Sequence, residues 1–137
     1  MGDERRRLLM VDDDANIRRI AQLALTRMGP WDVFVAGSGD EALTIIEEFR
    51  PDAVLLDVMM PGMDGPTLLR KIRDLPGGAE LPVIFITAKV QIQEVDNLMR
   101  MGVAGIISKP FDVKSLSREV SSIVQYWELQ GMTCGRS

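Results

Sequence analysis

The fold is decided by the stretch AVLLDVMMPGMDG, residues 53–65, in which an apolar run ends abruptly at Asp57. Pro51 precedes the run, and Pro61 and Gly62 follow it. A short apolar run between such breaks is typical of a strand that is buried on both faces. Asp57 then lies at the carboxyl end of this strand, where open parallel α/β sheets have their ligand crevice. An isolated Asp at such a point is more often an ordinary turn residue, so its role depends on the rest of the chain.

Composition limits the classes of protein that this sequence can encode. The chain has 137 residues, which is enough for one domain with a substantial core. It contains one cysteine, Cys134, and no histidine, which argues against a disulfide framework or a zinc site and favours a cytoplasmic protein. The net charge of −4 argues against direct binding to nucleic acid or to a membrane. The basic cluster at residues 5–7 is too short to change this expectation.

Strand-like and helix-like segments alternate along the chain. Apolar runs predict strands at residues 8–11, 33–36, 53–56, 83–87 and 106–108. Apolar residues at helical spacing predict helices over residues 17–28, 41–49, 64–75, 95–99 and 112–127. The expected helix caps are Ser38, with Glu41 completing a capping box, Asp64 and Asp112.

The last two predicted helices carry further expectations. Val95, Leu98 and Met99 should face inward, and the final helix should bury a stripe that runs from Val113 to Trp127. Residues 128–137 show no periodicity. We therefore predict one domain over residues 1–127, followed at 128–137 by an unstructured C-terminal tail or the start of a linker.

Strict alternation, with strands that are apolar throughout, predicts an α/β fold. The expected architecture is a single doubly wound sheet of five parallel strands with five helices on its two faces. Right-handed crossovers place the carboxyl ends of all these strands at one edge of the sheet. The residues that follow the strand ends then meet, although they are far apart in the sequence: Asp12, Asp13, Asp57, Thr87 and Lys109.

These five residues suit the chemistry of a phosphoryl group. Carboxylates in a partly buried cleft repel one another unless a cation or protons neutralise them. In proteins Mg²⁺ is usually bound by one or two carboxylates together with waters and phosphate oxygens. Lys109 would add a positive charge and Thr87 a hydroxyl, and one carboxylate would be the nucleophile of an in-line transfer. The alternative is an acidic surface edge with a chance salt bridge, which the joint placement of all five groups disfavours.

Four motifs carry a resemblance to a known family. They are LMVDDD at residues 9–14, LLDVMMPGMDG at 55–65, ITA at 86–88 and KPF at 109–111. From Leu8 to about Trp127 the chain resembles the receiver domains of two-component response regulators, including the stand-alone chemotaxis receiver. The resemblance implies a flavodoxin-like sheet with strand order 2-1-3-4-5, and that order is carried over from the family, not worked out from the residues.

The resemblance also implies a function. Asp57 would accept a phosphoryl group from a phosphohistidine on a sensor histidine kinase or a phosphotransfer protein. The chain would be a signalling receiver that catalyses its own phosphorylation and dephosphorylation, not a conventional enzyme. Thr87 and Lys109 would bind the phosphoryl oxygens and report their arrival to the face built from the fourth helix, the fifth strand and the fifth helix. That face would regulate a downstream protein or an output domain outside this sequence.

Further details of the site follow from the same resemblance. The implied ligands of Mg²⁺ are Asp13, Asp57, the backbone carbonyl of Met59, and Asp12 directly or through water. A cis Lys109-Pro110 bond is also implied, and X-Pro bonds have lost most of the usual preference for trans.

Two departures from the family pattern affect the expected output. Ile106 occupies the position of the family's switch aromatic, which leaves the usual output mechanism open. Met59 and Lys89 stand two residues beyond Asp57 and Thr87, at positions that govern the lifetime of the phosphoryl group.

Three other interpretations of the sequence are weaker. An aspartate-nucleophile phosphohydrolase would carry a second Asp at Met59, where it supplies the general acid and base. A nucleotide-binding domain would need a glycine-rich phosphate loop after a strand, and none is present in the sequence. A receiver-like module that only binds partners would not need the intact set of acceptor residues.

Overall fold

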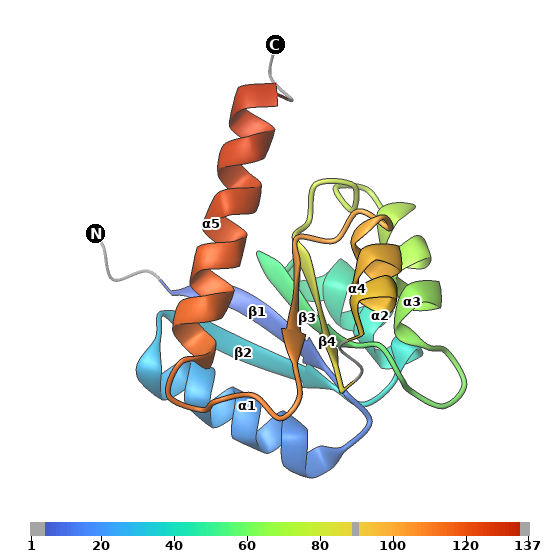
Figure 1. Ribbon diagram of the computed structural model, residues 1–137. Helices are drawn as coiled ribbons and strands as arrows, with labels where there is room; N and C mark the ends of the chain where they lie inside the picture. The colour runs from blue at the N-terminus through green and yellow to red at the C-terminus, as the bar shows by residue number, and fades with distance from the viewer. Residues whose placement is uncertain (1–4, 89–90, 135–137) are drawn as a thin grey trace.

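The structure, a computed structural model, describes residues 5–88 and 91–134, with side chains up to residue 131. Its centre is a five-stranded parallel sheet with strand order β2-β1-β3-β4-β5 (Figure 1). The strands are β1 (Arg6–Val11), β2 (Trp31–Ala36), β3 (Ala53–Asp57), β4 (Val83–Thr87) and β5 (Gly105–Ser108). The helices are α1 (Ala15–Met28), α2 (Gly39–Phe49), α3 (Gly65–Arg73), α4 (Ile92–Met99) and α5 (Leu116–Cys134). The predicted fold class and strand order are therefore confirmed.

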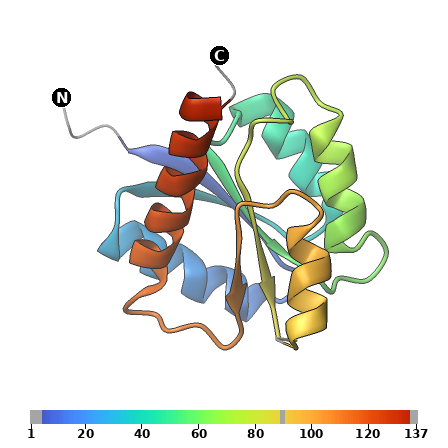
Figure 2. The same cartoon turned by 45° about the horizontal axis from the view of Figure 1, so that its top comes forward.

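Two hydrophobic cores cover the two faces of the sheet. Successive side chains of a strand point to opposite faces. Leu8 and Met10 of β1 therefore pack with α1 and α5, while Leu9 and Val11 pack with α2 and α3. Figure 2 shows the same division, with α1 and α5 on one face and α2, α3 and α4 on the other. Every residue of β3 and β4 is buried, as expected for central strands that are covered on both sides.

The predicted helix caps lie where their side chains can satisfy the first free N–H groups. The Ser38 hydroxyl accepts a hydrogen bond from the Glu41 backbone N–H at 3.2 Å, and the Asp64 carboxylate accepts one from the Thr67 N–H at 2.9 Å. Glu41 reaches back to the Gly37 N–H at 2.6 Å, one residue before the expected partner. The capping residues Ser38 and Asp64 therefore determine where α2 and α3 begin.

The start of α5 differs from the prediction. Asp112 does accept a hydrogen bond from the Lys114 N–H, at 3.1 Å, but the regular helix begins only at Leu116. Val113 consequently lies in the preceding turn and is 43% exposed, so its expected place on the buried stripe is wrong. The buried stripe consists of Leu116, Val120 and Val124.

The helix α4 buries less of its apolar face than predicted. Val95 and Leu98 are half-buried, but Met99 is 43% exposed, so the expectation that Met99 faces inward is wrong. The physical reason is that α4 is short and packs at the sheet margin against β5. Among the described helices α4 alone has no buried residue.

The helix α5 continues to Cys134, so an unstructured tail from residue 128 is wrong up to that residue, whereas the alternative, the start of a linker, stays a prediction. No apolar residue is buried at positions 128–131, where the structure describes the side chains, and contacts distant in the sequence hold this extension. The Arg6 guanidinium forms an ion pair with Glu128, and the Trp127 indole N–H donates to the Glu80 carbonyl at 2.9 Å. Neither α5 nor any other helix in the described part of the chain is long and apolar enough to cross a membrane.

Arg73, the last residue of α3, ties together the end of the sheet remote from the predicted site. Its guanidinium donates to the carbonyls of Gly78 and Leu81, both at 2.7 Å, and to that of Gly102 at 2.9 Å. It also lies 5.6 Å from the centre of the Trp127 ring. Burial lowers the pKa of Arg73, but an arginine side chain stays protonated in proteins, so the three carbonyls accept from a charged donor. One side chain therefore connects α3, two loops and α5.

Replacing Arg73 by Ala should lower the free energy of unfolding by about 2–4 kcal/mol, because three backbone carbonyls lose a charged donor. Arg70→Ala is the matched control, since Arg70 is exposed on the same helix. Urea denaturation followed by circular dichroism measures both variants. Equal stability of the two variants would contradict the connecting role of Arg73.

Candidate functional site

The carboxyl ends of four strands meet at one edge of the sheet, as the topology required. The register pairs Val11 with Leu56 and Asp57 with Ile86, so β1, β3 and β4 end side by side. On the other side of β4, the Lys109 N–H donates to the Thr87 carbonyl at 2.9 Å. The peptide bond between Lys109 and Pro110 is cis, as the family resemblance implied. The strand ends thus bring residues from distant parts of the sequence together.

Lys109 bridges two buried carboxylates. Its Nζ lies 2.9 Å from Oδ2 of Asp12 and 3.3 Å from Oδ1 of Asp57. Asp12 is fully buried and Asp57 is 4% exposed, while the Lys109 side chain is 21% exposed. Two carboxylates can share this desolvated position only because a cation lies between them. The structure therefore confirms that Asp12, Asp57 and Lys109 form one cluster.

Asp13 completes a group of three carboxylates. Asp12, Asp13 and Asp57 each offer one carboxylate oxygen, and these oxygens all lie within 4.8 Å of one another. Asp13 is exposed, so the group opens to solvent on its side. Oxygen donors in this number and spacing are those that a hard divalent cation uses.

The remaining contacts of the carboxylates show where a further cation would fit. Oδ1 of Asp12 accepts from the Asp14 N–H at 2.9 Å, and Oδ1 of Asp57 accepts from the Met59 N–H at 3.3 Å. Oδ2 of Asp12 is buried and has the Lys109 ammonium close by, but it accepts no hydrogen bond of good geometry. At 2.9 Å the Lys109 Nζ makes a Coulombic contact with Oδ2, and an electron pair of Oδ2 stays available to a further cation.

The pKa values follow from burial and from this cluster of charges. Burial, followed by the charge of Asp12, raises the pKa of Asp57, and the Lys109 ammonium offsets only part of that rise. Burial alone would lower the pKa of Lys109, but the close contact with the Asp12 carboxylate, at 2.9 Å, and the charges of Asp12 and Asp57 raise it overall. Lys109 is therefore charged at neutral pH, and the ionised form of Asp57 is held at a cost.

Gly65 allows the start of α3 to lie directly behind Asp57. The Gly65 N–H donates to the Val58 carbonyl at 2.9 Å, and a Cβ at Gly65 would lie 2.6 Å from the Asp57 carbonyl oxygen. A side chain at this position would displace the loop that carries Asp57. Sequence reasoning placed Gly65 in the motif but missed this packing role, which depends on a close approach that no local signal reports.

Thr87 and Met59 lie on the side of the site that faces α4. Thr87 is 2% exposed at the end of β4, whereas Met59 is 60% exposed in the loop after β3. With Glu94 and Leu98 of α4 they line a hollow of about 230 Å³. Lys89, the second flanking residue singled out in the sequence, lies outside the described residues.

Comparison with known proteins identifies the family. The family model of the response regulator receiver domain matches residues 8–121. The DNA-binding response regulator MtrA of Mycobacterium tuberculosis is 39% identical over 120 residues, which cover 88% of this chain and 51% of that protein. The structure of a putative response regulator from Chloroflexus aurantiacus is 35% identical, with a TM-score of 0.80 over 88% of this chain and 98% of that one. Chemotaxis protein CheY4 of Vibrio cholerae is 26% identical, with a TM-score of 0.81 over 87% and 98%.

The chain is a receiver domain of the two-component signalling type. It belongs to the response regulator receiver domain family, as the resemblance of its motifs predicted. It spans about half the length of the curated relatives that it matches.

The raised pKa of Asp57 predicts a gain in stability when its charge is removed. A carboxyl whose folded pKa is raised costs stability as the pH rises from its ordinary value of 3.8 to the folded value, and the cost persists above that range. In buffer with a chelator at pH 7, Asp57→Asn should therefore have a higher urea midpoint than the wild type.

This difference should shrink as the pH falls below the ordinary value of 3.8, where Asp57 is protonated in both the folded and the unfolded state. Asp96→Asn, on the exposed surface of α4, is the control. A lower midpoint for Asp57→Asn at pH 7 would show that the ion pair with Lys109 outweighs burial.

Proposed function

We propose that Asp57 accepts a phosphoryl group from the phosphohistidine of a sensor histidine kinase or a phosphotransfer protein. The observation that carries this proposal is the Lys109 bridge, with Nζ at 2.9 Å from Asp12 and 3.3 Å from Asp57. A nucleophile for phosphorus must lie where positive charge can receive the phosphoryl oxygens. Asp57 has that charge beside it, and its Oδ1 lies at the end of a rigid central strand.

The transfer would be an in-line exchange at phosphorus. A carboxylate oxygen of Asp57 attacks, and the new O–P bond forms as the N–P bond of the donor breaks. The electron pair of the broken bond stays with the imidazole nitrogen of the donor. Lys109 would shift its ammonium from the Asp57 oxygen to a phosphoryl oxygen, and the buried Asp12 would keep it at the site. Thr87 would donate its hydroxyl to a second phosphoryl oxygen.

The three carboxylates fit a bound Mg²⁺. Asp12, Asp13 and Asp57 supply hard oxygen donors within 4.8 Å of one another, and the Met59 carbonyl would add a neutral one. When bound, the ion would supply positive charge to the phosphoryl oxygens as they approach Asp57. Asp13, which is exposed, leaves an open side by which the donor can enter.

The side chain at Met59 disfavours the phosphohydrolase alternative. That chemistry requires a general acid and base two residues beyond the nucleophile. A thioether that is 60% exposed can neither donate nor accept the proton. We therefore infer a receiver that holds the phosphoryl group as a signal and does not turn over a small substrate.

The face formed by α4, β5 and α5 is suited to report phosphorylation. The helix α4 has no buried residue, its N-cap residue Gln91 makes no side-chain cap bond, and the hollow beside Thr87 separates it from the acceptor loop. Elements with few buried contacts rearrange at the lowest cost. A shift of Thr87 toward the phosphoryl group would therefore be transmitted first to α4.

Ile106 in β5 favours Thr87 over residue 106 as the carrier of the signal. Ile106 is half-buried and packs against the core beneath α3 and α4. A β-branched side chain is stiff at χ1 and gains little by leaving one apolar site for another. Ile106 should therefore stay packed in both states.

The partners proposed for this chain are proteins. MtrA is by its name a DNA-binding response regulator, and the chain corresponds to about half of it. We propose that this domain acts in the cytoplasm and regulates either a downstream protein or an attached output domain. The net charge of −4 gives this chain itself no basis for direct binding to nucleic acid or to a membrane.

Asp57 should be the only stable acceptor when the protein is treated with a small acyl phosphate and Mg²⁺. Intact-mass analysis should show one phosphoryl adduct in the wild type and none in Asp57→Asn or without Mg²⁺. Asp13→Ala should reduce both the adduct yield and the affinity for Mg²⁺, because it removes a ligand and a charge. Asp96→Asn should leave the yield unchanged. An adduct of equal yield in Asp57→Asn would refute the assignment.

Thr87→Ala should separate phosphorylation from its structural effect. The variant should still be phosphorylated at Asp57, but the phosphorylation-dependent amide NMR shifts of α4 and α5 should be lost, whereas Ile106→Ala should keep them. Mass analysis of the same samples controls for equal phosphorylation. If Ile106→Ala erases the shifts and Thr87→Ala preserves them, the signal runs through residue 106 and the proposal for Thr87 fails.

A further inference from the structure

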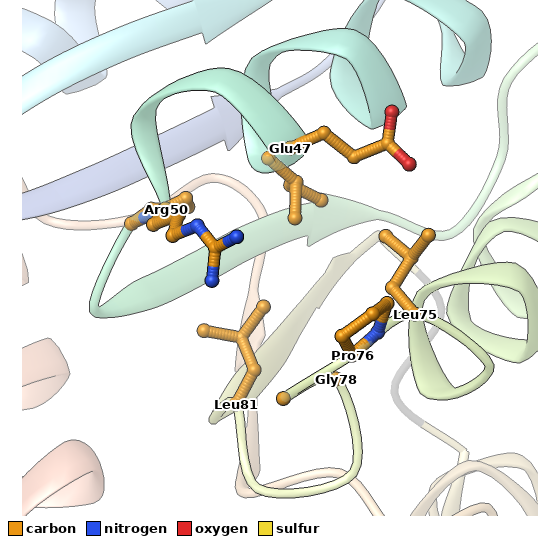
Figure 3. A pocket seen from close by; sticks show the side chains of 9 residues that line it. Glu47, Arg50, Leu75, Pro76, Gly78 and Leu81 are labelled. Carbon is orange, nitrogen blue, oxygen red and sulfur yellow. The ribbon is translucent and has the colours of Figure 1, made fainter.

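A pocket lies at the amino ends of β3 and β4, opposite the acceptor edge of the sheet. It is formed by the end of α2 and by the loop between α3 and β4, and its volume is about 360 Å³ (Figure 3). Since liquid water takes about 30 Å³ per molecule, this volume suits a ligand of about ten non-hydrogen atoms. None of its lining residues belongs to the acceptor site. The lining residues are Ile46, Glu47, Arg50, Pro51, Leu75, Pro76, Gly77, Gly78 and Leu81.

One wall of the pocket is fixed in place before any ligand arrives. Arg73 donates to the carbonyls of Gly78 and Leu81, at 2.7 Å each, and so holds the loop at its middle and near its end. Gly78 packs so closely that a Cβ there would lie 1.7 Å from the Ile72 carbonyl oxygen. A loop fixed in this way does not need to be ordered on binding, which lowers the entropic cost of binding a small molecule.

Arg50 supplies an unpaired positive charge at the opposite wall. No ion pair or side-chain hydrogen bond of Arg50 is present among the residues that the structure describes. In Figure 3 its guanidinium lies over the space beside Leu81, while the Glu47 carboxylate points away from Arg50. The two charges therefore do not neutralise each other across the pocket. A guanidinium next to an apolar floor is the arrangement that recognises a carboxylate with an apolar body.

The backbone of Arg50 is an additional reason to assign it a role. Its φ of 49° and ψ of 69° lie in the left-handed region, which is unfavourable for a residue with a Cβ. The following residue is Pro51, which disfavours helical backbone geometry at the preceding position. Glycine would satisfy this helix end at lower cost. Arginine therefore occupies a position that local preference disfavours, and from this position its guanidinium lies over the pocket.

We propose that this pocket binds a small organic carboxylate with a compact apolar body. The carboxylate pairs with the Arg50 guanidinium, and the apolar body covers Leu75, Leu81 and Ile46. A ligand that also carries an ammonium gains a second charged contact at Glu47. Binding here does not depend on phosphorylation, because the pocket and the acceptor site lie at opposite ends of β3 and β4.

The test is an amide NMR titration of the whole chain with 4-methylpentanoate and with its neutral analogue 4-methylpentan-1-ol. The acid should give saturable shifts in residues 46–51 and 75–81, and the alcohol should bind roughly tenfold more weakly, because it lacks the charge that pairs with Arg50. L-Leucine, which carries an ammonium beside its carboxylate, distinguishes amino acids from simple carboxylates as ligands of the pocket. If leucine binds more tightly than 4-methylpentanoate and Glu47→Gln abolishes this difference, the ligand is an amino acid. If the two bind equally, the ligand is a simple carboxylate.

Arg50→Gly makes the proposal falsifiable without relying on a misfolded variant. Glycine should raise the urea midpoint by relieving the left-handed backbone, and it should also abolish the preference for the acid over the alcohol. Arg70→Gln, which changes an exposed arginine outside the pocket, should leave that preference intact. Equal binding of acid and alcohol by the wild type, or shifts centred on Thr87 and Lys109, would overturn the proposal. An acid preference that persists in Arg50→Gly would do the same.

Discussion

Two carboxylates, Asp12 and Asp57, are buried at the ends of adjacent strands with the Lys109 ammonium between them. Such an arrangement is stable only if the cation stays close, because two desolvated like charges would otherwise force one group to take up a proton. The two strands lie in register on a sheet that is packed on both faces, so the carboxylates cannot move apart. The sheet therefore maintains a repulsion between the two carboxylates, which a phosphoryl group on Asp57 and a divalent cation can reduce.

The rigidity of the domain is distributed unequally, and that distribution suits a switch. The central strands, α3 and the extended α5 are held by buried residues, by Arg73 and by the ion pair between Arg6 and Glu128. The helix α4 has no buried residue and borders a hollow beside Thr87. A change of charge at Asp57 can therefore move α4 more easily than the other, firmly packed elements. A modification shifts the equilibrium between two conformations only if it interacts more favourably with one of them than with the other.

The sequence predicted the features that follow from local chemistry or from topology. Ser38 and Asp64 cap their helices because capping depends on neighbouring residues, and Asp12, Asp57 and Lys109 meet because parallel strands end at one edge. The misplaced residues depend on contacts between distant segments. Helical spacing could not show that α4 lies at the sheet margin, which exposes Met99, or that α5 begins after Val113. The extension of α5 rests on Glu128 and Arg6, which are 122 residues apart, and no local pattern reports that contact.

We propose that the Asp57 carboxylate receives the phosphoryl group within the cluster of Asp12, Asp13, Thr87 and Lys109. A crystal structure of the protein with Mg²⁺ and beryllofluoride, which mimics a phosphoryl group on a carboxylate, measures this directly. We expect beryllium bonded to an Asp57 oxygen, fluorines on the Lys109 ammonium and the Thr87 hydroxyl, and Mg²⁺ on the carboxylates of Asp13 and Asp57. Beryllium on another carboxylate, or Lys109 still paired with Asp57 in the complex, would contradict it.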